Sequence, residues 1–210
     1  MKPEMDYTLY LVTDRTLAGA RDFDDLVGRA VRGGCTLVQL REKDASSGEL
    51  YERALRLKRV TDYFHVPLII DDRVDIMLAV DAAGVHLGQS DLPAEAARRL
   101  IGPDKILGVS ARTVEEAEAA ESAGADYLGV GAVFPTATKT DAEPVARETL
   151  AAICAAVRIP VVAIGGLNAK NIPLLEGSGI SGAAVVSAVM GAEDPEEAAR
   201  KLKEVVYSIV

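Results

Sequence analysis

The feature that most constrains the fold of this chain is a regular alternation of short apolar runs with helical stretches. Eight apolar runs have the pattern of β-strands, and a stretch with the pattern of a helix follows each of them. The expected strands span residues 7–13, 36–40, 66–70, 84–87, 105–109, 126–130, 160–164 and 182–186. The expected helices span residues 23–33, 46–63, 74–80, 93–100, 113–123, 145–157, 168–176 and 195–207.

Strands that alternate with helices form parallel β–α–β units, and their strands are apolar throughout because both faces are covered. Eight such units in 210 residues predict an α/β fold, the (β/α)8 TIM barrel, as a single domain over residues 1–210. An open, doubly wound sheet is the alternative. A dinucleotide-binding fold is disfavoured, because the first strand-to-helix turn at residues 13–16 lacks a glycine fingerprint.

Three helix starts carry capping signals. Ser46 with Glu49 and Thr113 with Glu116 both match the capping box, in which a side chain at each position binds the backbone of the other. The segment 194–197, Asp-Pro-Glu-Glu, places an aspartate before a proline at the first helical position. These signals predict the starts of the second, fifth and eighth helices.

The charge balance limits the partners of the protein. Its 23 Lys and Arg residues against 32 Asp and Glu residues give a net charge of −9. Nucleic acids and anionic membranes require an extended basic face, so neither is expected as a partner. A local cluster of Lys and Arg can still bind a small anionic substrate.

The cysteines and the N-terminus indicate the compartment. Cys35 and Cys154 are far apart and lack metal-ligand spacing, so we expect two reduced, buried thiols. Residues 1–6 contain no apolar signal-peptide core, and no apolar run approaches membrane-spanning length. The sequence therefore predicts a cytoplasmic protein that has no membrane partner.

The end of the second strand carries a polar row. Because side chains alternate along a strand, Gln39, Arg41 and Lys43 share one face, whereas Leu40 points to the helices. Arg and Lys together suit a multiply charged oxyanion, since Arg binds through its planar fork and Lys as a point charge. The alternative is a solvated charge run in which Arg41 or Lys43 pairs with Glu42 or Asp44.

Carboxylates follow the third and fourth strands. Asp71 and Asp72 end the third strand, and Asp91 lies in the turn after the fourth. These residues could cap a helix or form a turn. They could also share a Mg²⁺ ion, which commonly takes one or two carboxylates together with substrate phosphates and water.

A long polar segment follows the sixth strand and holds Thr136, Thr138, Lys139, Thr140 and Asp141. Short hydroxyls, backbone N–H groups and one cation suit an anion such as a phosphate. A solvated surface loop is the alternative, and the unusual length of residues 133–142 also makes this segment a candidate lid.

The remaining strand ends carry small residues. In barrels, the segments after strands seven and eight often bind a phosphate, and Gly165 and Gly166 permit close backbone approach. A tight turn is the alternative. Ser110 ends the fifth strand and is either a donor to substrate or a turn hydroxyl. His86 lies inside the fourth strand, where a hydrogen-bonded core imidazole is expected.

Together these motifs resemble the thiamine-phosphate synthase family over nearly the whole chain. The segments that carry the resemblance are Gln39-Leu40-Arg41-Glu42-Lys43, Asp72-Arg73, Gly84-Val85-His86-Leu87-Gly88-Gln89-Ser90-Asp91, Phe134-Pro135-Thr136-Ala137-Thr138-Lys139 and Ile164-Gly165-Gly166. Each segment is short, but their order and their placement at strand ends are specific.

The resemblance implies a transferase that releases diphosphate from 4-amino-2-methyl-5-hydroxymethylpyrimidine diphosphate. The nitrogen of a thiazole phosphate, or of its carboxylated form, then attacks the pyrimidine methylene carbon. Mg²⁺ is the implied cofactor, bound by Asp72 and Asp91. The pyrimidine diphosphate site would contain Gln39, Leu40, Arg41, Glu42, Lys43, Asp71, Ser110 and Lys139. The thiazole phosphate site would contain Thr136, Ala137, Thr138, Gly166, Val186 and Ser187.

Within this set, the resemblance gives the catalytic roles to Arg41, Lys43, Lys139 and Ser110. The cations would stabilise the negative charge that develops on the leaving diphosphate. A dissociative substitution of this kind needs no protein nucleophile, in agreement with the lack of a nucleophile–base pair in the sequence.

Two features leave alternatives open. The family often has Asn-Asp where this chain has Asp71-Asp72, so the extra carboxylate could repel the diphosphate or join the metal shell. One alternative function is a related thiazole tautomerase, which would not need both aspartates and both cations. Another is a non-catalytic phosphate-binding barrel, which the fold alone does not distinguish from an enzyme. Barrels often form homo-oligomers, yet no exposed apolar stripe identifies an interface.

Overall fold

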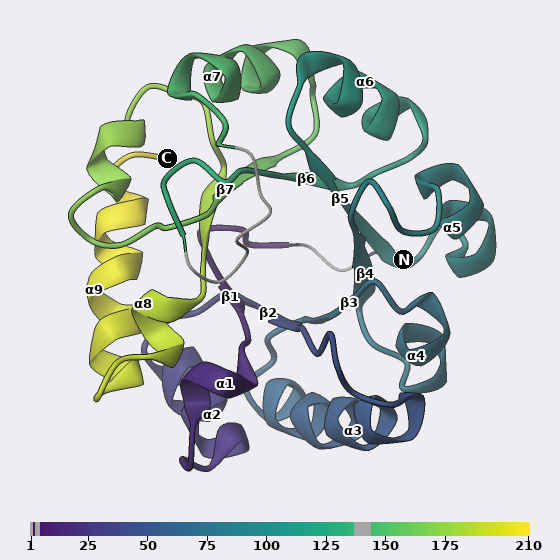
Figure 1. Cartoon of the computed structure of the whole chain (residues 1–210), viewed down its shortest axis with the longest axis vertical. Helices are drawn as coiled ribbons and strands as arrows, with labels where there is room; N and C mark the ends of the chain where they lie inside the picture. Colours follow the sequence, from purple (N-terminus) through teal and green to yellow (C-terminus); the bar gives the residue numbers. More distant parts are fainter. Residues whose placement is uncertain (1, 3–4, 137–143) are drawn as a thin grey trace.

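Eight parallel strands close into a barrel, and helices surround it (Figure 1). The computed structural model describes residues 2, 5–136 and 144–210. The strands are β1 Leu9–Val12, β2 Leu37–Leu40, β3 Leu68–Asp71, β4 Gly84–Leu87, β5 Ile106–Ala111, β6 Tyr127–Val130, β7 Val161–Ile164 and β8 Gly182–Val185. Because β8 pairs with β1, the predicted (β/α)8 barrel is confirmed and the open sheet is excluded.

The helices follow the expected order with two additions. They are α1 Arg15–Ala18, α2 Phe23–Arg32, α3 Ser47–Tyr63, α4 Val74–Ala79, α5 Ala94–Ile101, α6 Val114–Ser122, α7 Arg147–Ala156, the 3-10 helix η1 Ile172–Leu175, α8 Ser187–Met190 and α9 Pro195–Tyr207. The sequence patterns do not predict α1 or α8. Each has four residues, which is too short for a periodic signal, and each follows directly on a strand end.

The capping signals are confirmed at two helices and half confirmed at the third. At α3, the Ser46 side chain accepts from the Glu49 N–H and the Glu49 carboxylate accepts from the Ser46 N–H. At α9, the Asp194 carboxylate accepts from the second and third helical N–H groups. At α6, Thr113 caps Glu116 as expected, but the Glu116 carboxylate accepts from the N–H of Arg112 instead.

The helix expected over residues 168–176 is wrong. Only the 3-10 turn η1 forms there. Pro173 lacks the N–H that a helix would use. The Asn168 N–H donates to the Asn171 side chain at 2.8 Å, and Asn171 Nδ2 donates to the Gly166 carbonyl at 2.9 Å. These side-chain bonds to backbone groups hold the turn that leads into η1.

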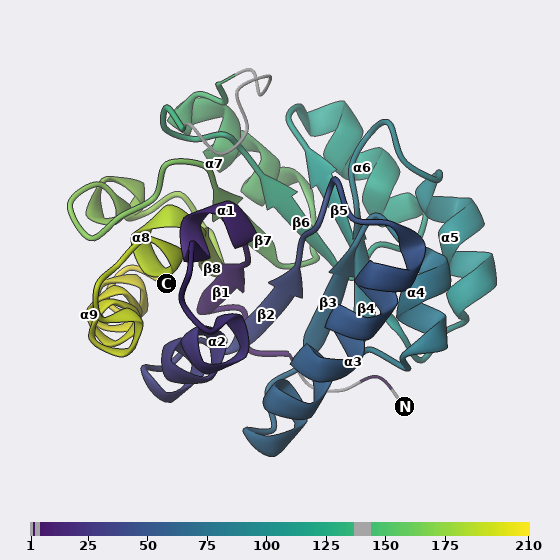
Figure 2. The ribbon, with the colours of Figure 1, turned by 60° about the horizontal axis from the view of Figure 1, so that its bottom comes forward.

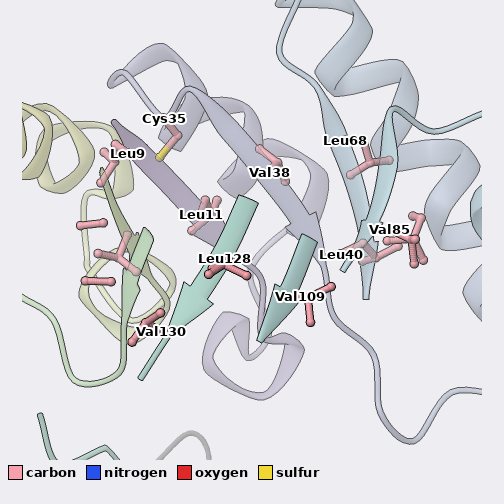
Figure 3. Packing of buried hydrophobic residues seen from close by; sticks show 14 of the residues in the cluster. Leu9, Leu11, Cys35, Val38, Leu40, Leu68, Val85, Val109, Leu128 and Val130 are labelled. Atoms are coloured by element: carbon pink, nitrogen blue, oxygen red, sulfur yellow. The ribbon is translucent and has the colours of Figure 1, made fainter. Parts of the chain in front are cut away.

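The larger core lies between the strands and the helices (Figure 3). Val38 and Leu40 of β2 point into this outer layer and are fully buried, together with Leu11 of β1 and Val85 of β4. Burying one such side chain contributes about 1.5–3 kcal/mol. The outward orientation expected for Leu40 is therefore confirmed.

A second, smaller core fills the barrel itself. Leu37, Ile69 and Val162 point inward, as the alternation along the strands requires. Two tyrosines, Tyr10 and Tyr127, are also fully inside this layer. A barrel interior is a packed core, and here it contains polar groups that need hydrogen-bond partners.

Two further expectations concern membranes and thiols. Among the helices in the described ranges, none is long and apolar enough to cross a membrane. Cys35 and Cys154 are free thiols, as expected. Cys35 is buried, but Cys154 is only half-buried, so the expectation of two buried thiols holds for one of them.

Candidate active site

A cleft of about 630 Å³ is lined largely by residues at or just after the carboxyl ends of the strands. Figure 2 shows this end of the barrel as the one to which the strand arrowheads point. Several strand-end residues expected from the sequence line the cleft: Gln39, Arg41, Lys43, Asp71, Asp72, Asp91, Ser110, Thr136, Gly166, Val186 and Ser187. The barrel thus brings residues from seven of its strand ends to one cavity, the usual position of the active site in this fold.

Cations and carboxylates pair directly at one side of the cleft. The Lys43 ammonium lies 3.0 Å from an Asp71 carboxylate oxygen and also donates to Asp72. The Arg41 guanidinium lies 3.8 Å from Asp71. Burial works against the charge of Lys43, but the two aspartates outweigh it and raise the pKa of this ammonium. The pairing of Lys43 or Arg41 with Glu42 is not seen.

Asp72 and Asp91 lie close together on the same side. Asp72 has a positive φ of 60°, a conformation that Asp tolerates better than most residues. Asp91 accepts a hydrogen bond of 2.7 Å from the Gly88 N–H. Burial raises the pKa of Asp91, and a hydrogen bond with Asp72 together with the charge of Asp72 adds to this effect. Two carboxyl groups that share a hydrogen bond form a site for a proton or a cation.

This pair fits the donor set of Mg²⁺. The ion prefers hard oxygen ligands, and one or two carboxylates are enough when phosphate and water complete its shell. Among the described residues, no group of three or more His, Cys, Asp or Glu side chains could hold a metal by itself. A cation at Asp72 and Asp91 would therefore need ligands from a bound anion.

Asp71 is the extra carboxylate that could either repel the diphosphate or join the metal shell. In the structure it balances the charges of two cations. Its side chain is only 10% exposed and faces both Lys43 and Arg41. Burial, with a contribution from Asp72, raises the pKa of Asp71 from 3.8 to about 6, although Lys43 and Arg41 act in the opposite direction. Without a ligand, Asp71 therefore offsets charge that a diphosphate would otherwise meet.

Two residues expected to bind the pyrimidine diphosphate point elsewhere. The Leu40 side chain is buried between β2 and the helices (Figure 3), so it cannot reach the cleft. Glu42 bridges Arg15 at 2.9 Å and Arg53 at 2.7 Å, and its side chain is 7% exposed. Neither side chain lines the cleft. The charge run 41–43 thus divides its side chains between the cavity and a buried ion-pair cluster.

The other side of the cleft has small and apolar residues. Gly166 has a φ of 63°, and a Cβ there would lie 2.4 Å from the Pro135 carbonyl oxygen. This contact brings the segment after β7 against the segment after β6, and it leaves no room for a side chain at residue 166. Thr136, Val186 and Ser187 line the same part of the cavity. Ala137, Thr138 and Lys139 lie outside the described residues.

Sequence reasoning missed the polar floor of the cleft. Tyr10 and Tyr127 reach it from β1 and β6, and His86 reaches it from β4. His86 is half-buried, with Nδ1 3.0 Å from the Tyr127 hydroxyl and Nε2 2.9 Å from Ser110 Oγ. The expectation of a hydrogen-bonded imidazole is confirmed, but its partners connect it to the cavity. The one sequence signal for this polar floor was a tyrosine at an inward-facing position of an otherwise aliphatic strand.

Comparison with known proteins gives a consistent result. A family model described as thiamine monophosphate synthase matches residues 9–189. The chain is 57% identical to the thiamine-phosphate synthase of Ruminiclostridium cellulolyticum over 205 residues, which cover 98% of each chain. It is 54% identical to that of Clostridium beijerinckii over 203 residues, 97% of each chain. A solved structure, thiamine phosphate pyrophosphorylase from Pyrococcus furiosus, is 44% identical with a TM-score of 0.90 over 98% of each chain.

Proposed function

The chain belongs to the thiamine monophosphate synthase family and is therefore a transferase, and we propose that the cleft at the mouth of its barrel carries out the family reaction. A hydroxymethylpyrimidine diphosphate and a thiazole phosphate, or its carboxylated form, are converted to thiamine phosphate and diphosphate. The observation that carries this proposal is the cluster of Arg41, Lys43, Asp72 and Asp91 in one cleft.

The cation cluster would bind and stabilise the leaving diphosphate. Arg41 presents a planar fork and Lys43 a compact charge, and both are already oriented by ion pairs to Asp71 and Asp72. Negative charge builds on the diphosphate oxygens as the bond to the methylene carbon breaks. One preorganised donor aimed at developing charge is worth about 3–4 kcal/mol. Lys139, which lies outside the described residues, is proposed to add a third cation.

Asp72 and Asp91 would hold Mg²⁺ together with the diphosphate. When bound, Mg²⁺ supplies Lewis-acid stabilisation of the diphosphate oxygens. The two aspartates keep their oxygens adjacent, because Asp91 is fixed by Gly88 and Asp72 by its turn conformation. Lys43 now neutralises Asp72 and would have to share that carboxylate with the ion. No side chain has to act as a nucleophile.

The second substrate would occupy the opposite side of the cleft. Gly166, Val186 and Ser187 line the cleft there, and a phosphate can accept from backbone N–H and hydroxyl donors. Thr136 is proposed to contribute there, with Ala137 and Thr138 of the segment outside the described residues. In this proposal the thiazole would lie across the cavity from the leaving group.

The remaining expectations on partners and location stay proposals. We propose two small anionic substrates as the partners of the site. We also propose a cytoplasmic location, whose reducing conditions suit the free thiols of Cys35 and Cys154.

Release of diphosphate distinguishes the proposed function from its alternatives. The purified protein is incubated with the pyrimidine diphosphate alone, the thiazole phosphate alone, and both, each with and without Mg²⁺. A synthase releases diphosphate on the turnover timescale only with both substrates and Mg²⁺. A tautomerase changes the thiazole with no diphosphate release, and a non-catalytic barrel changes neither. Either of these last two outcomes would exclude the synthase.

A further inference from the structure

Five polar side chains form a continuous chain of hydrogen bonds along the floor of the cleft. Gln39 Nε2 donates to the Tyr10 hydroxyl at 2.7 Å, and the Tyr10 and Tyr127 hydroxyl oxygens lie 2.8 Å apart. Tyr127 continues to His86 Nδ1 at 3.0 Å, and His86 Nε2 lies 2.9 Å from Ser110 Oγ. The five residues belong to β2, β1, β6, β4 and β5 in that order, so the hydrogen bonds cross the barrel interior. Figure 1 shows where these strands lie around the barrel.

Both tyrosines in this chain keep their protons. Burial raises the pKa of Tyr10 and the pKa of Tyr127 well above the ordinary value for a phenol. Each hydroxyl therefore has one proton to donate, and each also accepts through its oxygen. Each hydroxyl has a single proton, so it can donate to only one of its two neighbours. The partner at one end of the chain therefore determines which way every hydroxyl donates.

The Gln39 amide sets that direction. Because the Tyr10 hydroxyl accepts from Gln39 Nε2, its own proton is available to Tyr127. Tyr127 then accepts from Tyr10 and donates to His86 Nδ1. A ring nitrogen that accepts carries no proton, so a neutral His86 has its proton on Nε2 and donates it to Ser110 Oγ.

Close packing holds the rings of the chain in place. A Cβ at Gly108 would lie 2.2 Å from Tyr127 Cζ, and a Cβ at Gly129 would lie 3.0 Å from His86 Cε1. The Tyr7 ring packs on the Tyr127 ring with the centroids 5.0 Å apart. Glycines on β5 and β6 thus make room for the two rings, and Tyr7 fixes one of them from below.

We propose that this one-way chain holds His86 in the tautomer protonated at Nε2 and thereby presents the proton of the Ser110 hydroxyl to the cleft. Ser110 Oγ accepts from His86, so its own proton is available to a ligand atom with a lone pair. The ligand group at this position is therefore a hydrogen-bond acceptor. Tyr10, Tyr127 and His86 are positioning residues, because they act through Ser110.

The identity of that acceptor rests on the proposed function. An unprotonated ring nitrogen of the pyrimidine is an acceptor and matches the Ser110 proton. The exocyclic amino group of the same ring is a donor and does not match it. The chain would thus select how the pyrimidine ring is turned in the cleft, and with it the direction of its methylene carbon.

The tautomer can be measured directly in the intact protein. The sequence contains two histidines, His65 and His86, so ¹⁵N-histidine labelling of this 22.1 kDa chain gives two sets of imidazole signals. His65 is exposed, and His65→Gln identifies its signals by their loss. At about pH 8 we expect the His86 Nε2 resonance to be of the protonated type and the Nδ1 resonance of the unprotonated type. The reverse pattern, or an even mixture of tautomers, would overturn the proposal.

A pair of tyrosine variants tests whether the chain is the cause. Tyr127→Phe keeps the ring and removes the donor to His86 Nδ1, so the population protonated at Nε2 should fall. In the activity assay, kcat/KM for the pyrimidine diphosphate should fall roughly three- to tenfold, the scale of one neutral hydrogen bond. Tyr7→Phe is the matched control, because its ring packs on Tyr127 but its hydroxyl is not part of the chain. It should keep the wild-type tautomer and a rate within about twofold of wild type.

A folded Tyr127→Phe protein that keeps the wild-type tautomer would also overturn the proposal. If that variant does not fold, the wild-type spectrum still decides, since the proposal fixes its pattern. The spectrum needs no substrate, so a failure here is separate from a failure of the proposed function, which is measured by diphosphate release.

Discussion

The carboxylates at the barrel mouth are the side chains on which the proposed mechanism depends most. Asp72 and Asp91 are held side by side before any ligand binds. Asp72→Asn or Asp91→Asn keeps the shape of the side chain and removes one negative charge. We expect kcat with Mg²⁺ to fall roughly 10²–10³-fold, the scale of one lost electrostatic contact in an active site. The Mg²⁺ concentration that gives half the maximal rate should rise in both variants.

The matched control for these variants is Asp75→Asn. Asp75 is exposed, pairs with Arg73 at 2.8 Å and does not line the cleft. Its loss should leave the rate within about twofold of wild type. Wild-type activity in either Asp72→Asn or Asp91→Asn, measured with both substrates, would show that the metal assignment is wrong.

Asp71 should give the protein a specific dependence of stability on pH. Its pKa is raised from 3.8 to about 6 in the folded state. Between these values the folded protein binds a proton that the unfolded chain does not, so the free energy of unfolding rises as the pH falls from about 6 toward 4. Above pH 6, ionised Asp71 destabilises the fold, by an amount on the order of 1–3 kcal/mol.

Asp71→Asn should remove this dependence. Urea unfolding of both proteins in a chelating buffer, at several pH values across that window, gives the difference between them. We expect the difference in the free energy of unfolding between the two proteins to change with pH. Asp71 is the cause of this change, since the other carboxylates are common to both proteins. A difference that stays constant across the window would mean that Asp71 titrates normally.

At the scale of elements, the start of α3 depends on its capping box. Ser46 and Glu49 satisfy two backbone N–H groups that no helical bond can reach. Ser46→Ala should lower the free energy of unfolding by about 1 kcal/mol, with no change in m-value or in kcat. Ser46→Asp, another good cap, should restore most of the loss. Equal stability of all three proteins would contradict the role of the box.

Glu42 connects three elements that bear on the cleft. It links the end of β2 to Arg15 of α1 and to Arg53 of α3. Glu42→Gln removes the charge and leaves two arginines without their shared partner, which should cost about 1–3 kcal/mol of stability. Since Arg41 and Lys43 flank it, KM for the pyrimidine diphosphate should rise more than kcat falls.

Glu95→Gln is the control for the Glu42 variant. Glu95 is an exposed member of a pair with Arg99 on α5, where a surface ion pair contributes little. Unfolding curves of the two variants measure the effect on stability, and steady-state kinetics measure the effect on KM and kcat. A Glu42→Gln protein as stable as Glu95→Gln would contradict the view that Glu42 holds these elements together.

For the whole molecule, local sequence patterns predicted the order of the barrel elements. The alternation along β2 also predicted that Arg41 and Lys43 face the cavity while Leu40 faces the helices. Those features depend on residues two to four apart, where periodicity is informative. The helix expected over residues 168–176 was wrong, although Pro173 is a local signal against a helix there.

Contacts between distant segments could not be predicted in this way. Tyr10 and Tyr127 are 117 positions apart, and nothing near either residue indicates the other. The charges at 41–43 likewise do not reveal that Glu42 pairs with Arg15 and Arg53 rather than with its neighbours. Closure of the barrel decides both, because it brings inward-facing and strand-end side chains together.

The central claim is that this barrel joins two phosphorylated rings. The most direct test is to incubate the purified protein with Mg²⁺, the hydroxymethylpyrimidine diphosphate and the thiazole phosphate, and to quantify thiamine phosphate by mass spectrometry. We predict one thiamine phosphate for each diphosphate released, and loss of both products when a chelator removes Mg²⁺. A folded protein that forms no thiamine phosphate under these conditions would contradict the account.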